Sequence, residues 1–177
     1  MLLRLLGLLG LTDPGSDSGP LAVADIASPE ERAGCEAVIA RWAAARLAEK
    51  GAVVAVDRQE DLGRWYLRLK GDEKDFVTIW LTLRQRTLHH ETQVMPSPEV
   101  NLSETFEYLL RRNADLHQMR FALGLEDAVY LVGEIPVSMV SEEELDRIVG
   151  SSLAYVDAFF PTAMSIGFAG RYRRRPH

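Results

Sequence analysis

Apolar and polar residues alternate almost without a break between Arg64 and Met95, and the clearest run is Val77–Leu83. Side chains of a strand point alternately to its two faces, so this pattern predicts strands with one buried side and one solvent-facing side. The breaks between the runs are short. We therefore expect an antiparallel sheet whose apolar face is covered by helices.

Turn residues divide this region and the segments on either side of it into six strands. Glu60–Gly63 and Gly71–Lys74 are short enough for hairpin turns, and Gly124–Asp127 is a third turn. The two prolines of Met95–Pro98 end the first group of strands, because proline cannot donate to a sheet ladder. The expected strands are residues 52–58, 64–70, 76–84, 87–95, 118–123 and 128–136.

The first helix is predicted from its start and stop signals. Ser28 can cap the helix, Pro29 fits its first turn, and Glu31 completes a capping box. Gly51 is a suitable C-terminal stop. The single cysteine, Cys35, falls among the alanines of this helix, where a small buried thiol with a structural role is the expectation.

Two more helices follow from the same kind of signal. One is expected from near Leu102 to about Asp115, with Phe106, Leu109 and Leu110 as its apolar stripe. The last begins at Ser141 with a second capping box, and we expect Pro161 to break or bend it. The predicted fold is therefore α+β, an antiparallel sheet covered by helices in the order helix, four strands, helix, two strands, helix.

The two faces of the predicted sheet differ in character. Leu67 and Ile79 belong to the apolar face, whereas Tyr66 and Trp80 fall on the other, otherwise polar face. Large exposed aromatic side chains are uncommon without a partner. Either the N-terminal segment covers this face or the face is a recognition surface. The candidate protein-binding surface is Tyr66, Trp80 and His89.

His89, His90 and Glu91 form the most enzyme-like cluster, because imidazole and carboxylate groups are common zinc ligands. Adjacent strand residues point to opposite faces, so His89 and His90 are poorly placed to share an ion. His89 with Glu91 leaves a two-ligand site, which His117 completes only if the fold brings it close. A metal-dependent hydrolase using these three residues is the alternative function.

Other catalytic patterns are absent from the sequence. No serine sits in a Gly-x-Ser-x-Gly elbow, and the glycines do not form a phosphate-binding loop. We therefore expect a protein that is not an enzyme, with no catalytic residue, cofactor or resident metal.

The composition indicates the cellular compartment and argues against nucleic acid as a partner. A chain of 177 residues with 47% hydrophobic residues can form one domain with a real core, and a single cysteine suits the reducing cytoplasm. The net charge is −6, and four arginines lie within residues 171–175. Without them 16 basic residues face 26 acidic ones, so the body of the protein should repel nucleic acid.

The two ends differ from the rest of the chain. Met1–Leu11 is rich in leucine, but Arg4 interrupts it and it is shorter than the roughly 20 residues that span a bilayer, so stable membrane insertion is not expected. Asp13–Pro20 has the composition of a linker. The predicted organisation is an apolar extension and linker at 1–27, one domain at 28–167, and an Arg-rich tail at 168–177.

Several short segments together carry a family resemblance. They are Asn113–Leu116, Arg120–Leu123, Glu134–Val137 and Ser141–Leu145, with Trp80–Leu81 in the third strand. In these residues and in element order the chain resembles the YbjN family of bacterial sensory transduction regulators, in its actinobacterial form, over about residues 30–162.

The resemblance implies a fold similar to class I type III secretion chaperones, which are acidic α+β domains that commonly form dimers and bind extended segments of other proteins. The family brings no established catalytic residues. The sequence therefore predicts a cytoplasmic, non-enzymatic regulatory or chaperone-like domain that works as a homodimer and binds an unidentified protein or peptide.

Overall fold

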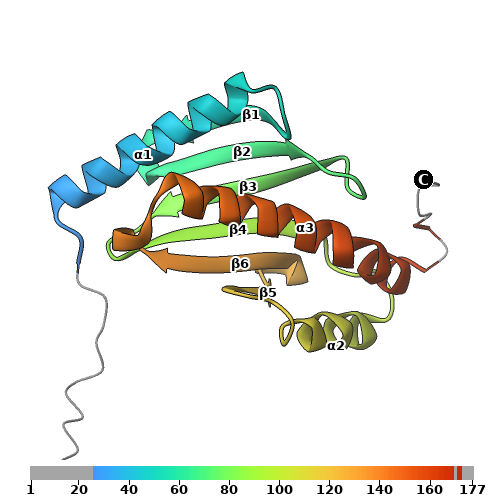
Figure 1. The fold of residues 1–177 in the computed structure, drawn as a ribbon. Coiled ribbons are helices and arrows are strands. Elements are labelled where there is room, and N and C mark those ends of the chain that lie inside the picture. The colour runs from blue at the N-terminus through green and yellow to red at the C-terminus, as the bar shows by residue number, and fades with distance from the viewer. Residues whose placement is uncertain (1–25, 170, 173–177) are drawn as a thin grey trace, which may run out of the picture.

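A six-stranded antiparallel sheet organises the protein, and its strand order is β1-β2-β3-β4-β6-β5 (Figure 1). The structure is a computed structural model that describes residues 26–169, 171 and 172. Neighbouring strands pair antiparallel throughout, as the short hairpin connections require. The strands are β1 (Val53–Gln59), β2 (Arg64–Lys70), β3 (Phe76–Leu83), β4 (Thr87–Met95), β5 (Met119–Leu123) and β6 (Val129–Pro136).

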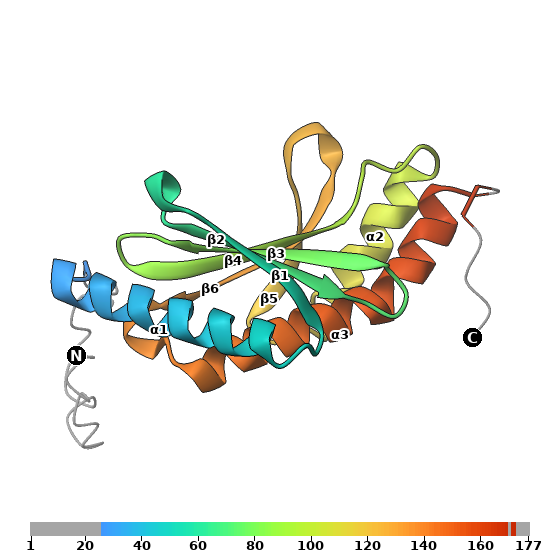
Figure 2. The same cartoon turned by 90° about the horizontal axis from the view of Figure 1, so that it is seen from above.

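Three helices complete the fold: α1 (Pro29–Ala48), α2 (Leu102–Arg112) and α3 (Glu142–Gly167). Figure 2 shows α1 and α3 together on one side of the sheet, with α2 near one end. Three short 3-10 turns, η1 (Glu60–Leu62), η2 (Leu125–Asp127) and η3 (Val137–Met139), connect the elements. The predicted α+β fold and the order of its helices and strands are confirmed.

The core lies between the sheet and the two long helices. Leu67, Leu69, Val77, Ile79 and Leu81 are completely buried, so the inner face predicted from the period of two is confirmed. Two predicted apolar positions near α2 were wrong, one from the strand pattern and one from the helix stripe. Leu123 is 52% exposed because it is the last residue of the edge strand β5, and Leu110 is 65% exposed, while Thr105 is buried in α2.

The first helix begins as predicted and ends slightly earlier. The Ser28 hydroxyl accepts the N–H of Glu31 at 3.2 Å, and the Glu31 carboxylate accepts the N–H of Ser28 at 2.7 Å. Such a capping box satisfies two backbone donors that the helix itself leaves unpaired. The helix stops at Ala48, and Lys50 rather than Gly51 adopts the left-handed backbone conformation, with φ of 53°.

The long helix α3 also departs from its prediction. Ser141 caps it by accepting the N–H of Glu144 at 3.2 Å, but the Glu144 carboxylate binds Arg147, so the second capping box is half formed. Pro161 was expected to break or bend the helix; a break is wrong, because Pro161 lies inside α3. Proline removes one backbone donor, and the buried neighbours Phe160 and Ala163 keep the last turns packed on the core.

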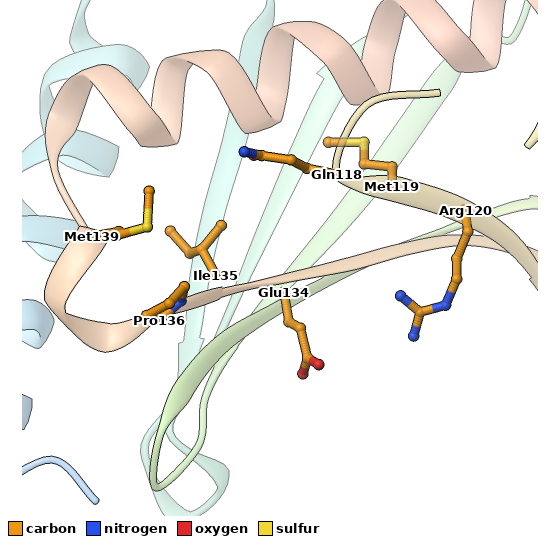
Figure 3. A pocket seen from close by; sticks show the side chains of 7 residues that line it. All are labelled: Gln118, Met119, Arg120, Glu134, Ile135, Pro136 and Met139. Atoms are coloured by element: carbon orange, nitrogen blue, oxygen red, sulfur yellow. The ribbon is translucent and has the colours of Figure 1, made fainter. Parts of the chain in front are cut away.

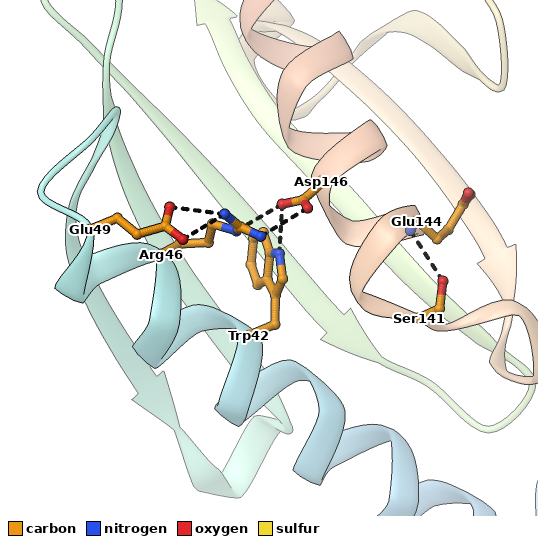
Figure 4. Close-up of polar contacts among 6 residues, drawn as sticks. All are labelled: Trp42, Arg46, Glu49, Ser141, Glu144 and Asp146. Atoms are coloured by element: carbon orange, nitrogen blue, oxygen red, sulfur yellow. Dashed lines mark hydrogen bonds and ion pairs between the residues drawn. The ribbon is translucent and has the colours of Figure 1, made fainter.

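A polar contact ties α1 to α3 above the core (Figure 4). The indole N–H of Trp42 donates to Asp146 Oδ1 at 2.8 Å, and Arg46 Nη2 donates to Asp146 Oδ2 at 3.1 Å. Arg46 also binds Glu49 at 2.8 Å. The two carboxylate oxygens of Asp146 therefore fix how the helices lie side by side.

Gly133 in β6 has no room for a side chain, because His90 and the backbone of Gln118 approach it closely. A Cβ atom there would lie 2.4 Å from His90 Cε1 and 2.5 Å from the backbone oxygen of Gln118. Gly133→Ala should therefore lower the free energy of unfolding by about 1–3 kcal/mol. Gly150→Ala in α3 is the matched control, because nothing lies within 4 Å of that position. Alanine there should raise stability by about 0.5–1 kcal/mol in the same urea titration, and equal effects at both sites would contradict this packing.

Candidate binding surface

The sheet face opposite α1 and α3 is the candidate functional surface, and we call it the outer face. No described helix lies across it, and the η1 and η2 hairpin ends rise on that side (Figure 2). Register and burial place on this face every second residue of the central strands. Its central members are Tyr66, Trp80, Glu91 and Val132, which pair in turn across β2, β3, β4 and β6.

Three aromatic side chains form a row on the outer face. Tyr66 meets Trp80 edge-to-face with ring centroids 6.3 Å apart, and Trp80 meets Tyr130 at 6.5 Å. The Tyr66 hydroxyl donates to Gln59 Oε1 at 2.7 Å, which fixes its ring. All three rings are partly exposed. The row is thus a pre-arranged apolar strip with polar edges, a composition enriched in protein interfaces.

Cationic side chains flank the row along β2. Arg64, Arg68 and Lys70 alternate with buried residues and so share the outer face with Tyr66. The Arg68 guanidinium lies 4.0 Å from the ring centroid of Phe76. Arg64 reaches Glu91 only at 4.0 Å, and the described part of the chain holds no ion pair of Arg68 or Lys70. Asp57 of β1, opposite Tyr66, is an acidic member of this half. The three cations still give it a basic excess, although the whole chain carries a net charge of −6.

His89 lies on the outer face as predicted, but it is less accessible than a contact residue would be. Its side chain is 12% exposed, and Nε2 lies 3.5 Å from Glu91 Oε2. Burial lowers the pKa of His89, as does nearby Arg84, while Glu91 acts in the opposite direction. His89 is thus a neutral imidazole near pH 7 that orients Glu91.

His90 points to the opposite face, as the period of two requires. It is 2% exposed, and its Nε2 finds no hydrogen-bond partner. The three residues of the hydrolase alternative are not brought together as ligands. Within residues 26–169, 171 and 172 no group of three His, Cys, Asp or Glu side chains could hold a metal ion. The backbone N–H of His117 instead donates to the Tyr155 hydroxyl at 3.3 Å, beside α3.

Cys35 occupies a structural position. It is 9% exposed, and its thiol donates to the backbone oxygen of Val137 at 3.4 Å. Burial, together with Glu31, raises the pKa of the thiol. A raised pKa keeps the sulfur protonated and unreactive near neutral pH, which agrees with the structural role expected from the sequence.

Two features of the surface escaped the sequence analysis. Tyr130 was available from the period of two in residues 128–136, because it alternates with buried Val129 and Leu131. The second feature is a pocket of about 370 Å³ lined by Gln118, Met119, Glu134 and Met139 among others (Figure 3). It lies where β6 continues past the end of β5, a difference in length that the predicted strands 118–123 and 128–136 already have.

The predictions for the chain ends lie largely outside the described residues. This holds for the leucine-rich segment Met1–Leu11, for its possible cover of the outer face, and for Arg173–Arg175. Arg171 is described, and its Nη1 pairs with Glu99 Oε2 at 2.5 Å. None of the described helices combines the length and apolar character needed to cross a bilayer.

Comparison with known proteins identifies the family. The model of the YbjN family, described as "Putative bacterial sensory transduction regulator", matches residues 36–164, which is more than half of the chain. The chain belongs to the YbjN family. The resemblance drawn from the sequence is therefore confirmed, and the match includes the whole sheet with the aromatic row of this YbjN protein.

Relatives of this YbjN protein occur in mycobacteria. An uncharacterized protein of Mycobacterium tuberculosis is 30% identical over 108 residues, and one of Mycobacterium leprae is 28% identical over 109 residues. These matches cover 61% and 62% of this chain, and the chain spans 59% of the length of either relative.

One similar solved structure is the type III secretion chaperone SycH of Yersinia pestis, determined in complex with a stable fragment of YscM2. The two chains are 14% identical with a TM-score of 0.46, and the match covers 71% of this chain and 98% of that chain.

Proposed function

We propose that this YbjN protein is a non-catalytic regulatory domain that binds an extended segment of a partner protein on its outer face. The observation that carries the proposal is the row Tyr66–Trp80–Tyr130 on the sheet face that no described helix covers. Aromatic side chains that keep a polar edge supply large contact area at small entropic cost. The description of the family as sensory transduction regulators supports a role in binding rather than chemistry.

The charges of the outer face define the chemistry of the partner. Arg64, Arg68 and Lys70 flank the aromatic row. Arg64 lies 4.0 Å from Glu91, and the described residues form no ion pair with Arg68 or Lys70. A partner segment with apolar side chains and neighbouring acidic residues would bury against the row and neutralise the three cations. Such complementarity mainly raises the association rate and selects the partner. We therefore expect binding to weaken as the salt concentration rises.

His89 contributes to this surface by positioning Glu91. With a 12% exposed side chain it contributes little contact area, but it holds Glu91 beside Arg64. Its place in the proposed function is to position Glu91 at the edge of the row. The hydrolase alternative gains no support, because His117 lies at the loop before β5 and does not join His89 and Glu91.

Trp80→Ala tests the proposed surface. Truncating a central aromatic residue of an interface typically costs about 2 kcal/mol or more, so we expect partner affinity to fall about 30-fold. Partners retained by the wild-type chain from a lysate of its source organism would be identified by mass spectrometry, purified, and titrated by calorimetry.

Leu47→Ala is the matched control for Trp80→Ala, because Leu47 is an apolar residue, 39% exposed, on α1 at the opposite side of the sheet (Figure 2). It should leave affinity unchanged. Equal affinities of wild type and Trp80→Ala, with circular dichroism showing both folded, would contradict binding through the outer face.

The proposal also includes a homodimer in the cytoplasm. Its support is the family resemblance, together with a buried and protonated Cys35 that suits a reducing compartment. Sedimentation equilibrium should give twice the chain mass of 19.8 kDa, whereas a mass of one chain at micromolar concentration would count against the dimer.

A further inference from the structure

The sheet has an unpaired stretch of edge beside β5. The pairing of β5 with β6 ends at Met119 opposite Gly133, but β6 continues through Pro136. On its other side the same stretch pairs fully with β4. Residues Glu134–Pro136 therefore have no strand partner on the β5 side within the described chain, and an unpaired strand edge is a template for strand addition.

A pocket lies directly over this unpaired stretch. Its volume is about 370 Å³, and it opens between the end of β5 and η3 (Figure 3). Ile135 and Met139 point to the helix side of the sheet, whereas Glu134 points to the outer side. A strand placed there would need apolar side chains toward Ile135 and Met139 and, alternating with them, a cation beside Glu134.

We propose that residues Leu3–Leu5 of this chain occupy the pocket as an added strand beside β6. In the sequence Leu3-Arg4-Leu5 the two leucines would enter the apolar side and Arg4 would lie next to Glu134. The carboxylate of Glu134 contacts the Thr87 hydroxyl at 3.5 Å and forms no ion pair with a described lysine or arginine. Arg120 lines the same pocket on the side of Glu134 without an ion pair to it (Figure 3), and Arg4 would place a second positive charge beside this carboxylate.

The point where the described chain begins favours this occupant. The N–H of Ala27 donates to the oxygen of Gln85 at 2.9 Å, and the N–H of Val137 donates to the oxygen of the adjacent Arg86 at 3.0 Å. Val137 lies between the pocket residues Pro136 and Met139. The chain thus enters the domain beside the pocket. The 22 residue steps from Arg4 to Ile26 can span at most roughly 75 Å, far more than this return requires.

This inference stands apart from the proposed function, because the pocket and the aromatic row are separate and Trp80 lines no part of the pocket. Failure of one therefore leaves the other intact. If it holds, Met1–Leu11 contributes to the edge of the sheet and blocks strand addition there by other chains.

Disulfide trapping in the full chain tests the added strand. Arg4→Cys with Glu134→Cys, on a Cys35→Ser background, should form an intramolecular disulfide at least about tenfold faster than Arg4→Cys with Leu125→Cys on the same background. Leu125 is the control because it is 91% exposed at the far hairpin end. Equal rates, or disulfide-linked dimers in place of the internal bond, would overturn the assignment to the same chain.

Trypsin cleavage after Arg4 in the wild-type chain gives a second readout that leaves Cys35 intact. Docking should slow this cleavage at least about tenfold relative to a synthetic peptide of residues 1–11, because the protease needs the segment to be released. Met139→Asp places a charge in the pocket and should restore fast cleavage. Cleavage of the wild-type chain at the rate of the free peptide would refute the docked strand.

Discussion

Trp42→Ala should destabilise the protein by about 3–5 kcal/mol, which is the range for truncating a buried large aromatic residue. Trp42 is 1% exposed between α1 and the sheet, and its indole N–H binds Asp146 in α3 at 2.8 Å. The substitution removes the packing and one of the two contacts to Asp146 that hold α1 against α3, while Arg46 keeps the other. Urea unfolding followed by circular dichroism measures the loss.

Two further variants of α1 separate the loss of core packing from the loss of polar contacts. Trp42→Phe keeps an aromatic ring but loses the bond to Asp146, so we expect a smaller loss of about 1–2 kcal/mol. Arg41→Ala removes a solvent-exposed ion pair with Glu142 and should cost less than about 1 kcal/mol. A loss at Trp42→Ala no larger than that at Arg41→Ala would show that Trp42 is not part of the core.

Acid should destabilise the protein through His90. The pKa of His90 is lowered to about 4, chiefly by burial and also by His89 and Arg147, while Glu144 acts in the opposite direction. In the unfolded chain the imidazole titrates near pH 6.5. Between these values the unfolded state binds a proton that the folded state does not, so the contribution is complete above pH 6.5 and is lost toward pH 4. From pH 7 to pH 4.5 the loss should be about 2–3 kcal/mol.

His90→Leu isolates this contribution, because leucine cannot take up a proton and other carboxylates titrate equally in both proteins. Urea titrations at pH 7 and pH 4.5 give the two differences in unfolding free energy. The wild-type protein should lose more stability than His90→Leu over this interval. An identical pH dependence would mean that His90 is protonated in the folded protein, which its unpartnered Nε2 and 2% exposure oppose.

The sheet could be predicted closely because its signal is local. Buried and more exposed residues alternate with a period of two in Arg64–Lys70 and in Phe76–Leu83. This alternation predicts both the strands and the face on which each side chain lies. Predictions were wrong where tertiary context decides. Leu110 and Leu123 belong to apolar patterns but lie near the end of the sheet, where the core stops. The break expected at Pro161 does not occur, because its buried neighbours keep the helix packed on the core.

The candidate site was predictable only in part. Tyr66 and Trp80 follow from the alternation, and so does the separation of His89 from His90. The burial of His90 against Gly133 depends on which strands are neighbours, because β6 rather than β5 pairs with β4. The pocket beside Glu134 depends on the lengths of two strands that pair. The strand order is not encoded in a single stretch of sequence. The strand lengths were predictable, but the pocket also needs Met139 of η3 to lie beside them.

The most direct test of binding through the outer face is a ¹⁹F NMR titration of the chain labelled with 5-fluorotryptophan. Three resonances are expected from Trp42, Trp65 and Trp80, and single tryptophan-to-phenylalanine variants assign them. Trp42 and Trp65 are 1% and 2% exposed, so they serve as internal references. Adding the unlabelled, purified partner should shift the Trp80 resonance and leave the other two in place. Saturation of binding with an unchanged Trp80 resonance would contradict the account.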